Sequence, residues 1–126
     1  MRYQRAEFPL RLDGFTAARA FFAGCFAESD PKRESLWVAH VDSGARCIHV
    51  SCHEGDETGA HFALRDIIID AAVHRSAAII LAHNHPSRRR ATRRLASAAE
   101  ALDCTILDHL IFAGDECTSF RRIGLL

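Results

Sequence analysis

The sequence predicts an α/β domain in which helices flank a mixed β-sheet. Three observations lead to this class: apolar residues at helical spacing, short apolar runs typical of strands, and the alternation of these two patterns along the chain. The expected order is helix, two strands, helix, strand, helix and two strands. At 126 residues the chain is long enough to bury a core without disulfides or metals, so we expect one domain over residues 1–126.

Each expected element depends on a local pattern. In the first helix apolar side chains recur every three or four residues, and Asp13 or Thr16 could cap its start. The composition of residues 42–44 indicates a turn and hence an antiparallel hairpin, and residues 114–115 separate the last two strands. The expected helices are Ala17 to Phe26, about Phe62 to His74 and about Thr92 to Leu102, and the expected strands are Leu36 to Val41, Ala45 to Cys52, Ala77 to Ala82, Thr105 to Ala113 and about Thr118 to Phe120.

Composition excludes several classes of protein. Hydrophobic residues make up 48% and charged residues 25% of the chain, as in an ordinary globular protein. No apolar run approaches the roughly 20 residues of a membrane-spanning helix, and residues 1–7 do not resemble a signal peptide, so we expect a cytoplasmic protein without a membrane partner. The net charge of zero gives no global field that would attract nucleic acid. The cysteines, expected to be reduced, are odd in number and contain no C-x-x-C pair: Cys25, Cys47, Cys52, Cys104 and Cys117.

The segment from Ala77 to Ser87 carries the clearest chemical pattern. Its apolar run fits a strand covered on both faces, and it ends in His83 and His85. In an extended chain these two side chains point to the same face, about 7 Å apart, and can converge on one metal ion. Asn84 and Pro86 suit a chain that leaves the strand. The pair therefore indicates half of a metal site, although most isolated histidines are surface or satisfied core residues.

Three stretches of the chain carry a family resemblance. HNHPS, TRRLASAAEALDCTILDHLIFAG and TSFRRIGLL closely resemble the RadC-like branch of the JAB/MPN (JAMM) metalloprotease superfamily, over about Asp13 to Leu126. The resemblance implies a mixed sheet flanked by helices, similar in outline to the cytidine deaminase fold. We expect the helix-hairpin-helix region that often precedes this domain in RadC proteins to be absent.

The resemblance also implies a catalytic site. In the family, zinc is held by the two histidines of H-x-H and an Asp of a downstream S-x-x-D, and a Glu on an early strand is the general base. His83 and His85 match the histidines, and Glu34 stands where the Glu would be. Three protein ligands leave an open zinc position, and the ion lowers the pKa of its water so that a carboxylate can accept the proton. Without the resemblance, Glu34 would be interpreted as an exposed residue at a strand end.

The chain departs from the family pattern after HNHPS. The family Asp lies eleven residues beyond the second histidine, which is Ala96 here, and the Ser position is Arg93. No Asp lies between His85 and Asp103, and Asp103 is at the far end of the expected helix, roughly 15 Å from its start. Asp108 could in principle supply the missing ligand, but Asp108 and His109 belong to the family's ordinary LDHLIF strand, and we expect this pair to be a hydrogen-bonding group at a strand end. We therefore expect a degenerate site in which zinc binding is weak or lost.

Five arginines occupy seven residues at the expected start of the third helix: Arg88, Arg89, Arg90, Arg93 and Arg94. Cations are unfavourable there because the helix dipole already presents positive charge. The functional interpretation is a contact with phosphate, nucleic acid or an acidic protein surface. The alternative is a solvated turn in a chain that uses 15 arginines and one lysine.

Three functions of different classes remain open. The first is a zinc-dependent (iso)peptidase or related hydrolase that uses Glu34, His83 and His85. The second is a catalytically impaired domain that acts as a binding or scaffold module. The third is a nucleic-acid-associated accessory protein, indicated by the arginine cluster and by the DNA-repair label that the resemblance carries. Neither the residues nor the resemblance identifies a peptide or protein substrate or an oligomeric state.

Overall fold

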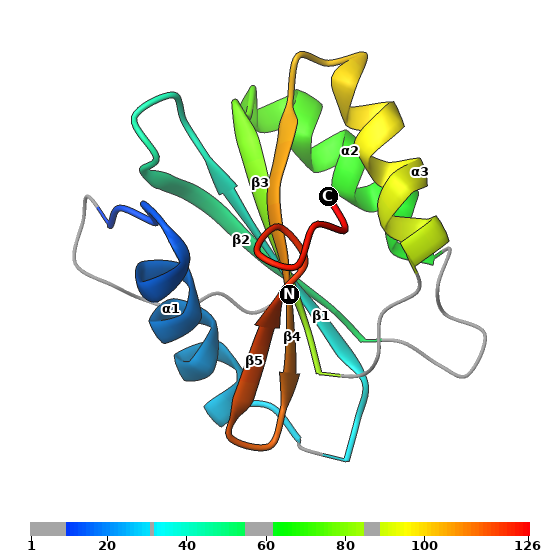
Figure 1. Ribbon diagram of the computed structural model, residues 1–126. Helices are drawn as coiled ribbons and strands as arrows, with labels where there is room; N and C mark the ends of the chain where they lie inside the picture. Colours follow the sequence, from blue (N-terminus) through cyan, green and yellow to red (C-terminus); the bar gives the residue numbers. More distant parts are fainter. Residues whose placement is uncertain (1–9, 31, 55–61, 85–88) are drawn as a thin grey trace.

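The computed structural model describes residues 10–30, 32–54, 62–84 and 89–126, and these form a five-stranded sheet with helices on both faces (Figure 1). The order of elements is the one that the sequence predicts. The helices are α1 (Phe15–Ala27), α2 (Phe62–His74) and α3 (Arg89–Glu100), and the strands are β1 (Ser35–Val41), β2 (Cys47–Glu54), β3 (Ala78–His83), β4 (Thr105–Ala113) and β5 (Glu116–Ser119).

The sheet is mixed, as predicted. Its strand order is β2-β1-β3-β4-β5, and β3 pairs antiparallel with β1 and parallel with β4. The predicted antiparallel hairpin between β1 and β2 is confirmed. The first five residues of β3 are buried, which agrees with a central strand covered on both faces.

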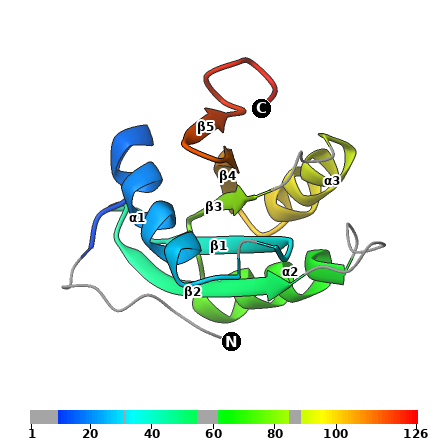
Figure 2. The same ribbon diagram turned by 90° about the horizontal axis from the view of Figure 1, so that it is seen from below.

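Two apolar clusters lie on opposite faces of the sheet. Ala39 and Ile80 pack in the cluster that includes the buried face of α1, and their chain neighbours Val38 and Leu81 pack in the cluster formed with α2 and α3. This alternation follows from the period of two along a strand. Figure 2 shows α1 on one side of β1 and β2, with α2 on the other side. Alternate residues of β1 therefore face different environments, and the face under α2 and α3 carries the histidine-containing clusters described below.

The start of α1 differs from the prediction. Its N-cap is Gly14, with φ 96°, and no side chain caps the helix, so the predicted cap by Asp13 or Thr16 is wrong. The carboxylate of Asp13 instead lies 3.7 Å from the guanidinium of Arg11. Glycine reaches this positive φ without the strain that a Cβ atom would bring.

Helix α3 begins at Arg89 and ends at Glu100, whereas the apolar pattern predicts Thr92 to Leu102. Arginine is a good helix former, and this explains how the helix can extend into the arginine cluster. Residues 101–103 form a turn, in which Asp103 has φ 54°. Two arginines of the cluster thus belong to the first turn of α3.

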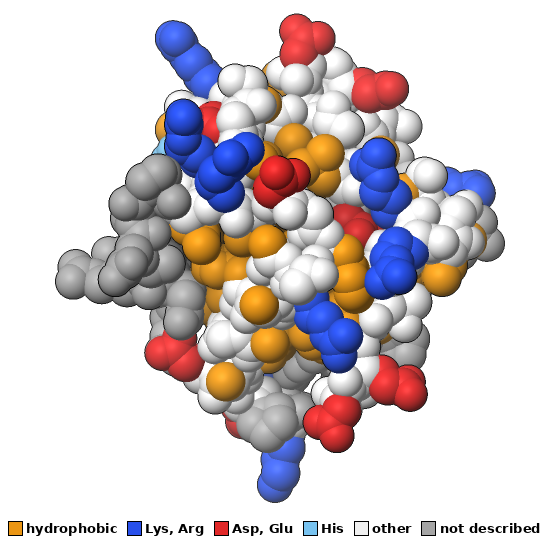
Figure 3. All heavy atoms as spheres, turned by 60° about the vertical axis from the view of Figure 1, so that its left-hand side comes forward, with side chains coloured by type: hydrophobic (Ala, Val, Ile, Leu, Met, Phe, Trp, Pro, Cys, Tyr) orange, Lys and Arg blue, Asp and Glu red, His pale blue; other side chains and the backbone are white. Residues whose placement is uncertain are grey.

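The surface and the cysteines agree with the compositional analysis. Positive and negative side chains are interspersed on the side of the molecule that carries α1 (Figure 3). All five cysteines are free thiols, and burial raises the pKa of Cys25 to about 12. Among the described helices, none is both long and apolar enough to cross a membrane.

Candidate functional site

Glu34 and His83 lie together where β1 begins and β3 ends. His83 is the last residue of β3, and its backbone pairs with Leu36 of β1. Glu34 lies two residues before Leu36, so side-chain alternation directs Glu34 toward the face of the sheet on which His83 lies. His83 Nε2 is 2.9 Å from Glu34 Oε1, and the two side chains are 13% and 38% exposed. The structure therefore brings together two of the site residues that the sequence predicts.

Asn84 fixes the backbone next to this pair. Its Oδ1 accepts a hydrogen bond from the N–H of Ser35 at 2.9 Å, and its Nδ2 donates to the backbone oxygen of Arg33 at 2.7 Å. Asn84 lies in a bend, as expected for a chain that leaves a strand. Its side chain has this further role, which the sequence pattern did not predict. The start of β1, and with it Glu34, is thereby tied to the end of β3.

A further imidazole, His109, lies near His83 on the neighbouring strand β4. The two ring centroids are 6.3 Å apart, and the ring of Phe120 is 4.9 Å from that of His109. Burial, followed by the electrostatic effect of the nearby His83, lowers the pKa of His109 to about 3. His109 is therefore neutral near pH 7. It was not among the predicted site residues, although it lies in the LDHLIF stretch that carries the family resemblance.

Asp108 faces away from His83. Its backbone pairs with Ile80, whose side chain belongs to the cluster on the α1 side of the sheet. The carboxylate accepts hydrogen bonds from the backbone N–H groups of His109 and Arg121, at 2.7 and 3.1 Å, and from the hydroxyl of Ser119. These bonds confirm the predicted hydrogen-bonding role, although Asp108 lies inside β4 and not at its end. Asp108 is therefore not placed to complete a metal site with His83.

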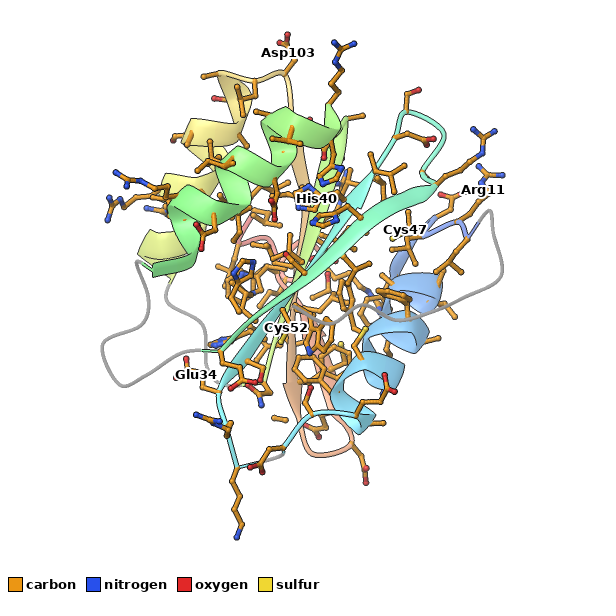
Figure 4. All side chains as sticks on the ribbon, turned by 180° about the vertical axis from the view of Figure 1, so that it is seen from behind. Arg11, Glu34, His40, Cys47, Cys52 and Asp103 are labelled. Atoms are coloured by element: carbon orange, nitrogen blue, oxygen red, sulfur yellow. The ribbon has the colours of Figure 1, made fainter. Side chains whose placement is uncertain are left out.

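Asp103 is also far from the pair. It is exposed and lies beyond the C-terminal end of α3, and Figure 4 shows it and Glu34 at opposite ends of the molecule. Ala96, at the position of the family Asp, packs against the core, and Arg93, at the position of the family Ser, is exposed. Neither position offers a metal ligand.

The predicted zinc site is thus matched only in part. Glu34 and His83 supply one carboxylate and one imidazole, and no group of three metal-ligating side chains in the described ranges includes them. His85, the second histidine of the motif, lies outside the described residues. A zinc site of this type needs three protein ligands, so the described donor set does not fit a tightly held ion.

The arginine cluster lies at the start of α3, as predicted. The first turn of this helix contains no acidic residue, and Arg93 and Arg94 are exposed in the following turn. Arg88, together with the side chains of Arg89 and Arg90, lies outside the described part of the chain. The described arginines of the cluster therefore lie near the N-terminus of α3, where the helix dipole disfavours positive charge, as predicted.

One cluster of side chains that could bind a metal ion was not predicted from the sequence. Each of His40, His49 and Asp70 offers a ligand atom within 4.8 Å of the others. The pattern that could have indicated it is the alternation of His49, Ser51 and His53 along β2, which gives a strand with polar groups on one face. The cluster lies on the face covered by α2.

Comparison with known proteins agrees with the geometry. A family model described as "RadC-like JAB domain" matches residues 15–125. A UPF0758 protein of Vibrio parahaemolyticus is 36% identical over an alignment of 104 residues, which covers 75% of this chain and 46% of that protein. A UPF0758 protein of Thiobacillus denitrificans is 46% identical over 70 residues, covering 49% of this chain and 31% of the relative. The chain therefore spans about half the length of the curated relatives that it matches.

Proposed function

Because this chain belongs to the RadC-like JAB domain family, we propose that it is a JAB-type domain with a degenerate zinc-dependent peptidase or hydrolase site, which binds a peptide or protein partner without hydrolysing it. The observation that carries the proposal is the Glu34–His83 pair, because neither Asp103 nor Asp108 stands beside it as a further ligand. Among the described residues, Glu34 corresponds to the general base of the family pattern and His83 to one of its two histidines.

The chemistry of such a site explains why an incomplete ligand set matters. His83 and His85 would hold the ion, and Glu34 would accept a proton from its water. Zinc supplies a lowered water pKa when it is bound with three protein ligands and one open position. With two histidines alone, both affinity and geometry degrade, because the ligand set and its supporting hydrogen bonds fix the ion. Binding of a partner next to the Glu34–His83 pair does not need that ion.

Zinc content and hydrolysis together test the proposal. The wild type and the His83→Ala/His85→Ala variant are purified without chelators, supplied with zinc in moderate excess, dialysed, and compared by elemental analysis. We expect the two proteins to retain the same amount of zinc, because a histidine pair alone holds the ion too weakly. Peptide and isopeptide substrates should be hydrolysed no faster by the wild type than by the matched Glu34→Gln variant. Loss of one zinc per chain in the double variant, together with hydrolysis that depends on Glu34, would overturn the proposal.

A second candidate function is a nucleic-acid or DNA-repair accessory module that uses the arginine cluster. The observation that favours it is the position of α3, which begins inside the cluster and has no acidic residue in its first turn. A helix N-terminus attracts anions, and added arginines strengthen a site for phosphate groups. The exposed side chains of Arg93 and Arg94 would extend such a surface along the helix.

Salt-dependent DNA binding tests this second candidate. Fluorescence anisotropy with a labelled duplex is measured for the wild type and for a variant in which Arg88 to Arg90 are changed to Gln. The matched control carries the same charge change at Arg11, Arg46 and Arg75. If the cluster binds phosphates, its neutralisation should reduce the slope of log affinity against log salt by about 0.9 for each phosphate that these arginines neutralise. Equal slopes for the two triple variants would exclude the cluster as the binding surface.

A further inference from the structure

Three ligand-type side chains from three different elements meet under α2. His40 of β1 and His49 of β2 are direct cross-strand partners, so their side chains lie on the same face of the sheet. Asp70 of α2 reaches the same point, and the three ligand atoms lie within 4.8 Å of one another. Figure 4 places His40 between the two strands and the helix, well separated from Glu34. This cluster takes no part in the proposed function.

His40 has one ring nitrogen without a partner. The residue is fully buried, and its Nδ1 lies 2.8 Å from the hydroxyl oxygen of Ser76. Its Nε2 is buried and has no hydrogen-bond partner among the described groups. A neutral imidazole has one N–H and one lone pair. If Nδ1 donates to Ser76, Nε2 presents its lone pair, and a buried polar atom left without a partner costs free energy that a ligand can recover.

The other two groups already have the spacing of metal ligands. His49 Nε2 lies 3.4 Å from Asp70 Oδ2, within hydrogen-bonding distance of it. Two ligand atoms of a tetrahedral zinc ion, each about 2.0–2.1 Å from the metal, are about 3.3 Å apart. The two side chains are 14% and 29% exposed, so solvent and an ion can reach this side of the cluster. His74, one turn after Asp70, stacks its ring on that of His49 with centroids 4.0 Å apart, which restricts the orientation of the His49 ring.

The protonation state of His40 also suits a ligand. Burial, followed by the nearby His49, lowers the pKa of His40 to about 4. The ring is therefore neutral near pH 7, which is the form that binds metal ions.

We propose that His40, His49 and Asp70 bind one zinc ion, with Ser76 orienting the His40 ring and solvent at the open coordination position. Two imidazole nitrogens and one carboxylate oxygen favour zinc over the oxygen-preferring calcium and magnesium ions. His40 lies in β1, six residues after Glu34, so this site is roughly 20 Å from the Glu34–His83 pair. The inference is independent of the degenerate peptidase site.

Zinc titration of the full chain tests the inference. Isothermal titration calorimetry with zinc chloride is performed on the wild type, on Asp70→Asn and on His49→Ala. Asp66→Asn is the matched control, because Asp66 is an exposed carboxylate one turn earlier on the same helix. The wild type and Asp66→Asn should bind one zinc per chain with equal affinity. Removing only a group that hydrogen-bonds to a ligand weakens metal sites about 10- to 100-fold, so the two ligand variants should lose at least tenfold in affinity.

Cobalt absorption supplies a second readout that does not depend on activity. Cobalt bound to two imidazoles and a carboxylate should show visible d–d bands without a thiolate charge-transfer band, and these bands should be absent in Asp70→Asn. A charge-transfer band would mean that cysteines hold the ion and would overturn the inference. Circular dichroism of each variant confirms that it is folded, and the near-isosteric Asp70→Asn keeps the test informative if His49→Ala does not fold.

Two further outcomes would also overturn the inference. One is a wild type that binds no zinc, and the other is unchanged affinity in both Asp70→Asn and His49→Ala. The His83→Ala/His85→Ala variant separates the two proposals, because it should keep its zinc if the His40 site is real. Zinc that is lost in that variant and retained in Asp70→Asn would place the ion at the H-x-H motif.

Discussion

The side chain of Asn84 binds the backbone on both sides of Glu34. It accepts a hydrogen bond from the N–H of Ser35 and donates one to the carbonyl of Arg33. Asn84, which follows His83 in the chain, thus holds in place Glu34, which contacts the His83 side chain. Glu34 and His83 come from strand ends that are 49 residues apart in the sequence. Asn84, the residue between the two histidines of the H-N-H motif, thus has a structural role.

Replacing Asn84 by Ala should destabilise the protein because both hydrogen bonds are removed. Two ordinary hydrogen bonds contribute about 1–3 kcal/mol together, so the free energy of unfolding should fall by that amount. Urea denaturation measures it. Ser43→Ala is the control, because Ser43 is exposed in the turn at the other end of β1 and a surface change of this kind should stay within about 0.5 kcal/mol. Equal stability of Asn84→Ala and the wild type would mean that these bonds do not hold the strand ends.

Asp108 should be important for stability and not for metal binding. Its carboxylate accepts three hydrogen bonds, and two of them, from Ser119 and Arg121, tie the segment Ser119 to Arg121 to β4. Hydrogen bonds to a charged group contribute about 1.5–3 kcal/mol each, so Asp108→Ala should lower the free energy of unfolding by about 3 kcal/mol or more. Ser119→Ala removes one of the three partners and should cost less.

Hydrogen exchange and zinc titration check the two parts of this prediction. The amide of Arg121 should exchange faster in Asp108→Ala than in the wild type, because it loses its acceptor. Zinc affinity should be unchanged, since the Asp108 carboxylate lies on the opposite face of the sheet from His83. A selective loss of zinc without a loss of stability would contradict the hydrogen-bonding role.

The elements could be predicted from the sequence where the apolar pattern has clear limits. Helix α2 and strand β4 have the expected bounds, because their periodic residues end at turn-forming ones. The cap of α1 was predicted wrongly, because Asp13 has Arg11 as an alternative partner and Gly14 takes a conformation suited to glycine. The start of α3 was placed three residues too late, because arginines carry no apolar periodicity although they favour helix.

The two candidate sites differ in how far the sequence could reveal them. Glu34 and His83 could be predicted from a motif and a resemblance, because each lies at a fixed position relative to a strand end. The meeting of His40, His49 and Asp70 depends on the register of the β1–β2 hairpin and on how α2 lies over it. Strand register and helix docking are tertiary properties. The sequence separations between the three residues form no recognisable metal-binding motif, so they do not indicate that the side chains meet.

Burial should protect Cys25 from chemical modification. Its thiol is fully buried, and burial, followed by the negative charge of Glu28, raises its pKa to about 12, so almost no reactive thiolate forms at pH 8. Alkylation with iodoacetamide, followed by mass spectrometry, should label the half-buried Cys52 before Cys25. In concentrated guanidinium chloride all five cysteines should react, which serves as the control. Labelling of Cys25 as fast as Cys52 in the folded protein would contradict the burial of α1 against the sheet.

Acid should destabilise the fold through His109. The pKa of His109 is lowered from 6.5 to about 3, so between these pH values the unfolded chain binds a proton that the folded chain does not. The stability that His109 contributes is therefore complete above about pH 6.5 and is lost as the pH falls toward 3. One titrating group changes the free energy of unfolding by about 1.4 kcal/mol per pH unit in this window.

Urea denaturation of chelator-treated protein between pH 4 and pH 6.5 measures this contribution. His109→Gln has one fewer proton to bind, so its free energy of unfolding should rise less steeply with pH than that of the wild type, by about 1.4 kcal/mol per pH unit. Ile111→Val, two residues further along β4, is the control: it removes a methyl group and no titrating group, and its slope should equal that of the wild type. Because other buried groups such as His40 titrate equally in all three proteins, only the difference in slope reports on His109. If His109→Gln keeps the wild-type slope, the imidazole is not held neutral in the folded protein and the buried contact beside His83 is not as described.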